Sequence, residues 1–206
     1  QALLSHRGPD EFNHIDIDSY SVMLHWRLAL VGGAGGSQPL ISPCGRYTLA
    51  FNGEIYNYLE LLSEWGVEKS CENVSDTEVL MAGLCAHGIS VLKELRGMYA
   101  GIFIDRKEGI THAFRDHLGI KPLYYFEHNN RLVISSEIKG ILRTLKSLNK
   151  SPEVRTAGQS EFLRTRFLPS SKTIYQNILK ARPGFIYKFK NRSFLASEPI
   201  FRPTNL

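Results

Sequence analysis

Residues 47–58 read Tyr-Thr-Leu-Ala-Phe-Asn-Gly-Glu-Ile-Tyr-Asn-Tyr, and this stretch decides the predicted fold. The apolar run 47–51 contains β-branched and aromatic side chains, which predicts a buried strand. Asn52-Gly53 accepts positive φ, so we expect a sharp turn at the end of that strand. The Asn52 amide and the Gly53 N–H would then point the same way, and two such donors suit an oxyanion.

The same dipeptide has a plainer interpretation. Asn-Gly is the commonest signal of a tight hairpin turn, which needs no functional role. However, the residues that follow, from Tyr56 to Leu62, space their apolar side chains like a helix and not like a returning strand. Glu54 adds a carboxylate directly after the predicted turn. The choice between a turn and a site therefore depends on the flanking sequence.

Composition predicts an ordinary globular protein with one sizeable core. The chain has 206 residues, of which 43% are hydrophobic and 22% charged. No apolar run approaches the roughly 20 residues of a membrane span, and no secretory leader is visible. The three cysteines, Cys44, Cys71 and Cys85, lack the spacing of a metal site, so we expect free thiols and no bound metal. These features predict a cytoplasmic protein that does not enter a membrane.

The net charge of +5 raises the question of nucleic acid. Most of the excess Lys and Arg residues follow Lys139, where they are scattered and do not form a stripe with interleaved aromatic side chains. A solvated surface, or a surface that docks on another domain, explains these charges equally well. We therefore rank nucleic-acid binding last.

The chain on both sides of residues 47–58 predicts strands, then helices, then antiparallel hairpins. We expect a strand at residues 19–27 and a nearly continuous apolar strand at 98–105. Ser75-Asp76-Thr77-Glu78 has the pattern of a capping box that opens a helix. Returning strands are expected at 110–116, 119–126 and 131–135, followed by a helix from Ser136. This order predicts an α+β protein with sheets covered by helices.

The last part of the chain has a different character. Residues 146–160 are polar and loop-like, and a final hairpin is expected at residues 185–195. We therefore divide the chain into a principal domain at residues 1–150 and an extension and linker at 151–206. The extension is too small for a second core of its own.

Several motifs occur in an order that resembles the glutaminase domain of glutamine-hydrolysing asparagine synthetases. These proteins are class II glutamine amidotransferases of the N-terminal-nucleophile hydrolase fold. The resemblance covers nearly the whole chain. The motifs are His6-Arg7-Gly8-Pro9-Asp10, Arg27-Leu28, Gln38-Pro39-Leu40, Phe51-Asn52-Gly53-Glu54-Ile55-Tyr56-Asn57, Ser75-Asp76-Thr77-Glu78, Arg96-Gly97-Met98, residues 115–124 and Ser136-Glu137.

The resemblance implies a four-layer αββα sandwich of two antiparallel sheets, here apparently missing its first strand and the start of a helix. It also implies a binding site for L-glutamine. Arg27 would bind the α-carboxylate, and Asp76 and Glu54 the α-ammonium. Asn52 and the Gly53 N–H would form the oxyanion hole, and backbone groups around Leu30 and Val31 would line the pocket. The plainer interpretation of Asp76 is a contribution to the helix dipole.

Other motif residues are expected to be structural. We expect Arg7 and Asp10, and likewise Arg115 and Asp116, to be buried or structural polar partners. The family mechanism uses no histidine, so His6, His25 and His117 are also assigned structural roles.

The sequence departs from the family at the nucleophile. In the family an N-terminal Cys attacks the γ-amide and its own α-amine accepts the proton. No Cys precedes Gln1, and Cys44, Cys71 and Cys85 do not match the nucleophile position. Three explanations stay open: an incomplete record of a normal enzyme, a degenerate relative, or a strand supplied by a partner chain. We expect weak or no glutaminase activity from this chain alone.

The resemblance implies that glutamine is hydrolysed to glutamate and that ammonia passes to an ATP-dependent amidation of aspartate or another carboxylate. That second reaction belongs to a synthetase domain or subunit, which would hold ATP and Mg²⁺. No cofactor is expected in this domain, and the resemblance leaves a homodimer open. The alternative is a non-catalytic glutamine-binding or interaction module derived from the same family.

Overall fold

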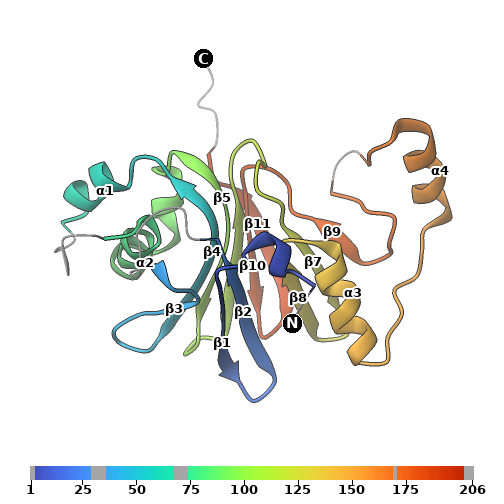
Figure 1. Ribbon diagram of the computed structural model, residues 1–206, viewed down its shortest axis with the longest axis horizontal. Coiled ribbons are helices and arrows are strands. Elements are labelled where there is room, and N and C mark those ends of the chain that lie inside the picture. Colours follow the sequence, from blue (N-terminus) through green and yellow to red (C-terminus); the bar gives the residue numbers. More distant parts are fainter. Residues whose placement is uncertain (1–2, 29–35, 67–73, 169–170, 202–206) are drawn as a thin grey trace.

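A computed structural model describes residues 3–28, 36–66, 74–168 and 171–201. Its largest element is an antiparallel six-stranded sheet with the strand order β11-β10-β6-β5-β4-β3 (Figure 1). The strands are β3 (Leu40–Ile41), β4 (Tyr47–Ile55), β5 (Gly97–Asp105), β6 (Ile110–Arg115), β10 (Phe185–Lys190) and β11 (Ser193–Pro199).

β4 begins where the sequence predicts a strand, but the expected turn at Asn52-Gly53 is wrong. The strand continues through both residues to Ile55 and pairs with β5 along its whole length, with Gly53 opposite Tyr99. Gly53 does have a positive φ of 154°. A Cβ at this position would lie 2.1 Å from the Met98 carbonyl oxygen. Glycine is therefore needed here because the backbone of β5 comes close, and not because the chain reverses.

One face of the six-stranded sheet packs against helices α1 (Tyr58–Glu64) and α2 (Asp76–His87) and the 3-10 helix η3 (Gly88–Lys93). α2 begins with the predicted capping box: the Ser75 hydroxyl accepts from the Glu78 N–H, and the Glu78 carboxylate accepts from the Ser75 N–H at 2.7 Å. The core between sheet and helices contains Leu49 and Phe51 of β4, both at most 2% exposed. Burying such side chains is the main stabilising contribution of this layer.

The other face of the sheet meets a second layer of strands, which consists of two separate sheets. One is the hairpin of β1 (Glu11–Asp18) and β2 (Ser21–Arg27), and the other has the order β8-β7-β9. The latter strands are β7 (Tyr124–His128), β8 (Arg131–Ser135) and β9 (Ile178–Lys180). Ala100, Ala113 and Tyr187 of the large sheet pack here against Leu123 and Tyr125.

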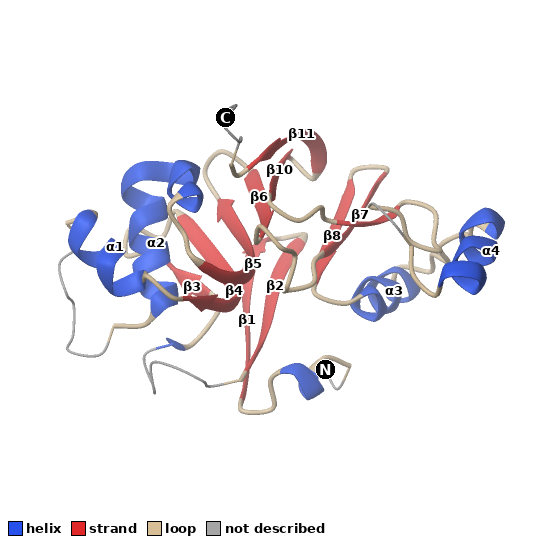
Figure 2. Ribbon diagram, turned by 90° about the horizontal axis from the view of Figure 1, so that it is seen from above, coloured by secondary structure: helices blue, strands red, loops and turns tan. Residues whose placement is uncertain are grey.

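A fourth layer is formed by α3 (Ile138–Ser147), which packs on the outer face of β7 and β8. The alternation of side chains along the strands explains this arrangement. Tyr125 faces the inner core, whereas Tyr124 and Phe126 face Ile141 of α3. Figure 2 shows α1 and α2 on one side of the strands and α3 on the other. The predicted four-layer αββα sandwich is confirmed.

The last part of the chain is more structured than its composition predicted. β9, β10 and β11 each pair within the sheets described above, so the final hairpin belongs to the large sheet. α4 (Thr156–Thr165) lies within a segment expected to be partly loop, and in Figure 1 it stands apart from the sheets. The division of the chain at residue 150 stays a prediction. Among the described helices, none has the length and apolar character that a membrane crossing requires.

Candidate active site

The inner face of β4 presents polar side chains. Leu49, Phe51 and Ile55 point into the core beneath the helices. Because side chains alternate along a strand, Asn52 and Glu54 point to the opposite face, toward the hairpin β1–β2. The Asn52 Nδ2 atom is buried and has no hydrogen-bond partner among the described residues. A buried amide donor without a partner is costly, which marks this position as one where a ligand would restore a hydrogen bond.

Asp76 reaches β4 from the first turn of α2. Its Oδ2 atom accepts a hydrogen bond from the Ile55 N–H at 3.0 Å, and its Oδ1 atom accepts from the Thr77 hydroxyl at 3.2 Å. Ser75 and Glu78 already form the cap, so this carboxylate is directed at the strand and does not serve as a cap. Asp76 is 8% exposed.

The electrostatics place Asp76 beside Glu54. Burial raises the pKa of Asp76, and the negative charge of Glu54 raises it further. Two neighbouring carboxylates, one of them buried, repel each other unless a cation lies between them. This pair is therefore suited to a positively charged group such as an ammonium.

Arg27 comes from the end of β2. Its side chain is 11% exposed, and its Nη1 atom lies 3.5 Å from Glu11 Oε2. The guanidinium also lies against Gly36, where a Cβ would be 2.6 Å from Nη2. A nearly buried guanidinium with a fork of donors is a suitable group for binding a carboxylate.

His25 joins the strand of Arg27 to the strand of Asn52. The two side chains at 25 and 27 are on the same face of β2, and His25 Nε2 lies 3.1 Å from the Phe51 carbonyl oxygen. Burial lowers the pKa of His25, so the ring is neutral and its Nε2–H donates to that carbonyl. Arg27 is two residues beyond His25 on the same face of β2, so this contact brings it toward Phe51, the residue before Asn52.

The structure thus brings together most of the predicted site. Asn52, Gly53 and Glu54 are consecutive on β4, Asp76 is hydrogen-bonded to the same strand, and Arg27 faces it from β2 through the His25 contact. Leu30 and Val31 lie outside the described residues. The roles of all these residues in binding stay predictions.

Sequence reasoning missed the polar residues Glu11 and Ser37 and the contact made by Gln38, all beside the site. Glu11 accepts hydrogen bonds from the Ser37 hydroxyl at 2.7 Å and from Arg27. Gln38 Oε1 accepts from the Phe51 N–H at 2.7 Å, which ties the loop before β3 to β4. The alternation of polar and apolar residues in 11–18 was the signal that could have revealed β1 and Glu11. Gln38 lies within a quoted motif, but its sequence gives no sign of its partner.

Arg115 and Asp116 are structural, as expected. Asp116 is 1% exposed, and its carboxylate accepts hydrogen bonds from the backbone of Leu118, Ile120 and Lys121. Arg115 donates to the backbone carbonyls of Lys121, Gly119 and Ala181. The two side chains hold the loop that leads to β7 and present no group for a reaction.

The two described cysteines are not on the strand of Asn52, and Cys71 lies outside the described residues. Cys44 is exposed in the turn that precedes β4, and Cys85 is on α2 in the helical layer. In the described ranges, no group of three or more His, Cys, Asp or Glu side chains is arranged to hold a metal ion.

Comparisons with known proteins agree on one family. A family model described as a glutamine amidotransferase domain matches residues 1–198. Asparagine synthetase (glutamine-hydrolyzing) 1 of Bacillus subtilis is 31% identical over 183 residues, which cover 88% of this chain and 28% of that protein. Asparagine synthetase B (glutamine-hydrolyzing) of Escherichia coli is 34% identical over 151 residues, which cover 73% of this chain and 27% of that protein. This chain therefore spans well under half the length of these relatives.

Solved structures show the same fold. Glutamine phosphoribosylpyrophosphate amidotransferase from B. subtilis aligns with a TM-score of 0.60 at 21% identity, covering 89% of this chain and 36% of that chain. The allosteric regulatory enzyme of purine biosynthesis aligns with a TM-score of 0.59 at 22% identity, covering 87% of this chain and 35% of that chain. The sandwich is thus the N-terminal-nucleophile hydrolase type that the sequence predicted. The family model shows that the chain belongs to the glutamine amidotransferase domain family, and the curated relatives that it resembles are glutamine-hydrolysing asparagine synthetases.

Proposed function

We propose that this chain binds L-glutamine and is the glutaminase part of an asparagine-synthetase-like amidotransferase. In that role it supplies ammonia for the ATP-dependent amidation of aspartate or another carboxylate. The observation that carries the proposal is the position of Asp76, a buried carboxylate of α2 that accepts a hydrogen bond from Ile55 N–H of β4 and interacts electrostatically with Glu54, on the strand that also carries the unpaired amide of Asn52. A fold alone would not require these groups to meet.

Each end of glutamine has a complementary group in this arrangement. Glu54 and Asp76 would bind the α-ammonium, because their mutual repulsion is relieved by a cation between them. Arg27 would bind the α-carboxylate with two parallel hydrogen bonds. Asn52 and the Gly53 N–H would stabilise the oxyanion that develops on the γ-carbonyl. Backbone groups around Leu30 and Val31 would line the pocket.

The reaction also needs a thiolate and a base. None of the three cysteines in the sequence matches the nucleophile position of the family, so we infer that this chain by itself releases little or no ammonia. We propose that a synthetase domain or subunit uses the ammonia and holds ATP and Mg²⁺, while this domain needs no cofactor. The extension at 151–206, whose strands β9 to β11 pair within the sandwich, would lead on to that domain or subunit, in a cytoplasmic enzyme.

Isothermal titration calorimetry with L-glutamine tests the binding step. We expect saturable binding of L-glutamine and much weaker binding of D-glutamine, since two charged ends and the amide must be matched at once. Glutarate monoamide, which lacks the ammonium, serves as the control for Glu54 and Asp76. A folded protein that does not bind L-glutamine would refute the proposal.

A non-catalytic glutamine-binding or interaction module is the second candidate, and the position of both described cysteines away from the site favours it. Ammonia release separates the two. If glutamine binds but full-length protein with its synthetase part releases no ammonia, the binding module is correct. Ammonia release that depends on Asn52 supports the glutaminase.

A further inference from the structure

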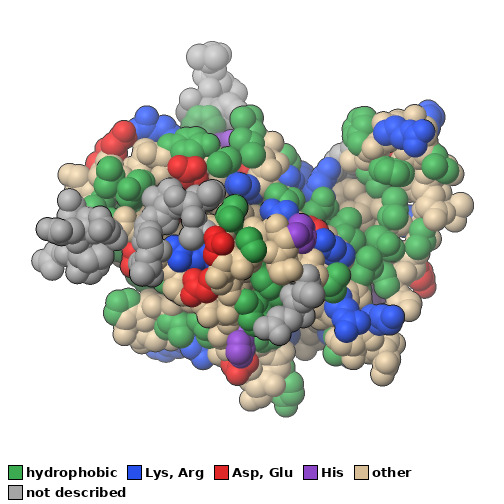
Figure 3. All heavy atoms as spheres, viewed as in Figure 1, with side chains coloured by type: hydrophobic (Ala, Val, Ile, Leu, Met, Phe, Trp, Pro, Cys, Tyr) green, Lys and Arg blue, Asp and Glu red, His purple; other side chains and the backbone are tan. Residues whose placement is uncertain are grey.

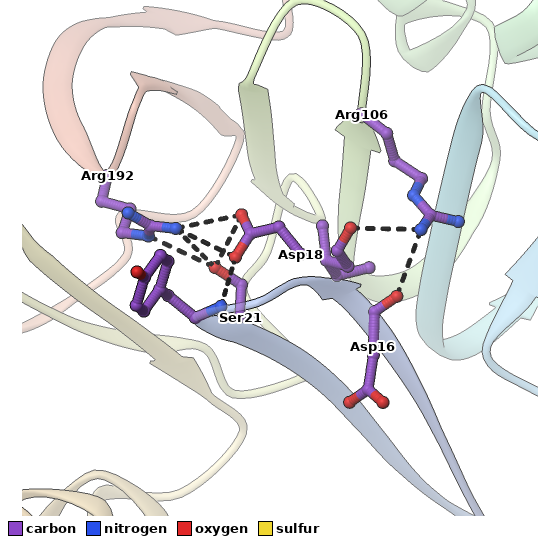
Figure 4. Close-up of polar contacts among 7 residues, drawn as sticks. Asp16, Asp18, Ser21, Arg106 and Arg192 are labelled. Carbon is purple, nitrogen blue, oxygen red and sulfur yellow. Dashed lines mark hydrogen bonds and ion pairs between the residues drawn. The ribbon is translucent and has the colours of Figure 1, made fainter.

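Two arginines from turns of the large sheet bind the tip of the β1–β2 hairpin (Figure 4). In the register of the hairpin, this tip is at the end opposite to Arg27. Arg192, in the turn between β10 and β11, places Nη2 3.0 Å from both carboxylate oxygens of Asp18. Its Nε and Nη2 atoms also donate to the Ser21 hydroxyl at 3.3 and 3.2 Å. Arg106, in the turn between β5 and β6, donates to the carbonyls of Asp16 and Ile17 at 3.2 and 3.1 Å.

The backbone at Arg192 is unfavourable for an arginine. Asn191 and Arg192 form a two-residue turn with φ values of 49° and 70°. In such turns the second position is normally glycine, because side chains disfavour positive φ. Arginine at this position therefore costs stability that glycine would not. The contact with Asp18 and Ser21 gives the side chain a reason to be there.

The hairpin needs such an attachment. β1 and β2 pair only with each other among the described strands, and an isolated two-stranded hairpin is at best marginally stable. Arg27 and Glu11, which pair with each other in register, are at its base, whereas Asp18 and Ser21 are at its tip. The angle of the hairpin over β4 thus depends on contacts at both ends.

We propose that Arg192, assisted by Arg106, is a positioning residue that holds the β1–β2 hairpin at the angle in which Arg27 faces the glutamine site. The inference rests on the proposed function, since it concerns the affinity for glutamine. When the contacts of Arg192 and Arg106 with the hairpin tip (the clamp) are absent, the hairpin samples orientations in which Arg27 is displaced. Only the fraction of molecules that keeps Arg27 in place then binds glutamine. The apparent dissociation constant rises in inverse proportion to that fraction.

Arg192→Gly is the informative variant, because it removes the side chain and also relieves the unfavourable backbone. The folded protein should therefore keep or gain thermal stability, while the dissociation constant for L-glutamine rises about fivefold if the competent fraction falls to about one fifth. Arg166→Gly is the matched control. Arg166 also has a positive φ, 63°, but it ends α4, away from the hairpin. The Arg166→Gly variant should gain stability without any change in glutamine affinity.

Asp18→Asn tests the same contact from the other side. If the two residues act through one clamp, the Arg192→Gly/Asp18→Asn double variant should bind glutamine no more weakly than Arg192→Gly alone. Hydrogen–deuterium exchange supplies a readout that needs no ligand. In each single variant we expect faster exchange of peptides covering 11–27, with unchanged exchange of β5 and β6.

Weaker glutamine binding by Arg192→Gly, with faster exchange at 11–27 and no effect of Arg166→Gly, supports the proposal. An unchanged dissociation constant overturns it, whether or not exchange becomes faster. Wild-type protein that binds no glutamine overturns the proposed function and this inference with it. In that case the exchange data still show whether Arg192 holds the hairpin, so the two failures are distinguishable.

Discussion

Replacing Asp76 by Asn should separate glutamine binding from folding. The amide of Asn keeps an oxygen that can accept from the Ile55 N–H, now 3.0 Å from Oδ2. Its nitrogen then faces the Thr77 hydroxyl, which can rotate from donating to accepting. The shape is retained, these two hydrogen bonds can still form, and the negative charge is lost.

The effect on binding should be large. If Asp76 pairs with the α-ammonium of glutamine, removing one member of this buried charge pair costs about 2 to 5 kcal/mol of binding free energy. Because about 1.4 kcal/mol corresponds to a factor of ten, the dissociation constant should rise at least about 30-fold. Isothermal titration calorimetry of wild-type and variant proteins measures this difference directly.

The effect on folding should be small and should depend on pH in a defined direction. Burial raises the pKa of Asp76 above its ordinary value of 3.8, so the folded state holds this proton more tightly than the unfolded state. The contribution of Asp76 to the free energy of unfolding therefore falls as pH rises through the raised pKa. Asn carries no charge and therefore does not have the cost of burying an ionised carboxylate. At pH 7 we expect the free energy of unfolding of Asp76→Asn to be within about 1 kcal/mol of the wild-type value. The stability of the variant relative to wild type should increase from pH 4 to 7.

Glu78→Gln is the matched control, because it changes another acid in the first turn of α2. Glu78 accepts from Ser75 in the capping box, and among the described residues no hydrogen bond or ion pair joins it to β4. Its change should lower stability slightly and leave glutamine affinity intact. If Asp76→Asn instead destabilises the fold by several kcal/mol while glutamine binds as before, Asp76 is a structural link and the site is wrong.

Three further predictions follow from the same geometry. Arg27→Lys should weaken L-glutamine binding by at least about tenfold in calorimetry, because a single ammonium cannot form the two parallel hydrogen bonds of a guanidinium; unchanged affinity would exclude Arg27 from the site. Gly53→Ala should lower the free energy of unfolding in urea by about 3 kcal/mol or more, because its Cβ would meet the Met98 carbonyl at 2.1 Å; a well-folded variant would contradict the close approach of β5. Burial lowers the pKa of both His25 and His112 below 6.5, so the unfolded state binds more protons and stability should fall as pH decreases below about 6.5. Between pH 7 and pH 5, the free energy of unfolding of His25→Gln should fall less than that of wild type. An equal fall would mean that His25 is not buried in its neutral form.

Local sequence rules predicted the elements whose signals are local. The capping box of α2 was readable because Ser75 and Glu78 complete it within four residues. β4 and β5 could be predicted because each contains a nearly continuous run of apolar residues. The four-layer arrangement came from the resemblance to a family, since no periodicity specifies how two sheets stack. That resemblance also assigned Asp76 to the same site as Asn52 and Glu54, which two separate local patterns could not place together.

The errors arose where distant contacts decide the outcome. Asn52-Gly53 was predicted to be a turn because positive φ usually marks one, but the close backbone of β5 explains Gly53 inside a strand. Arg192 belonged to a set of scattered basic residues, and on the face seen in Figure 3 the Lys and Arg side chains are indeed dispersed. Its partner Asp18 is 174 positions away. No pattern within a short window can reveal such a pair.

β4 serves the core with one set of residues and the site with the other, and this has a consequence for how the protein can change. Insertion or deletion of one residue between Tyr47 and Phe51 would exchange the two faces of the strand, moving apolar side chains to the glutamine side and Asn52 and Glu54 under the helices. Substitutions on one face leave the other untouched, whereas changes in length damage both at once. Relatives of this chain should therefore keep the length of this strand and keep its core-facing positions apolar, and libraries that seek a new substrate should vary only the alternate residues on the glutamine side.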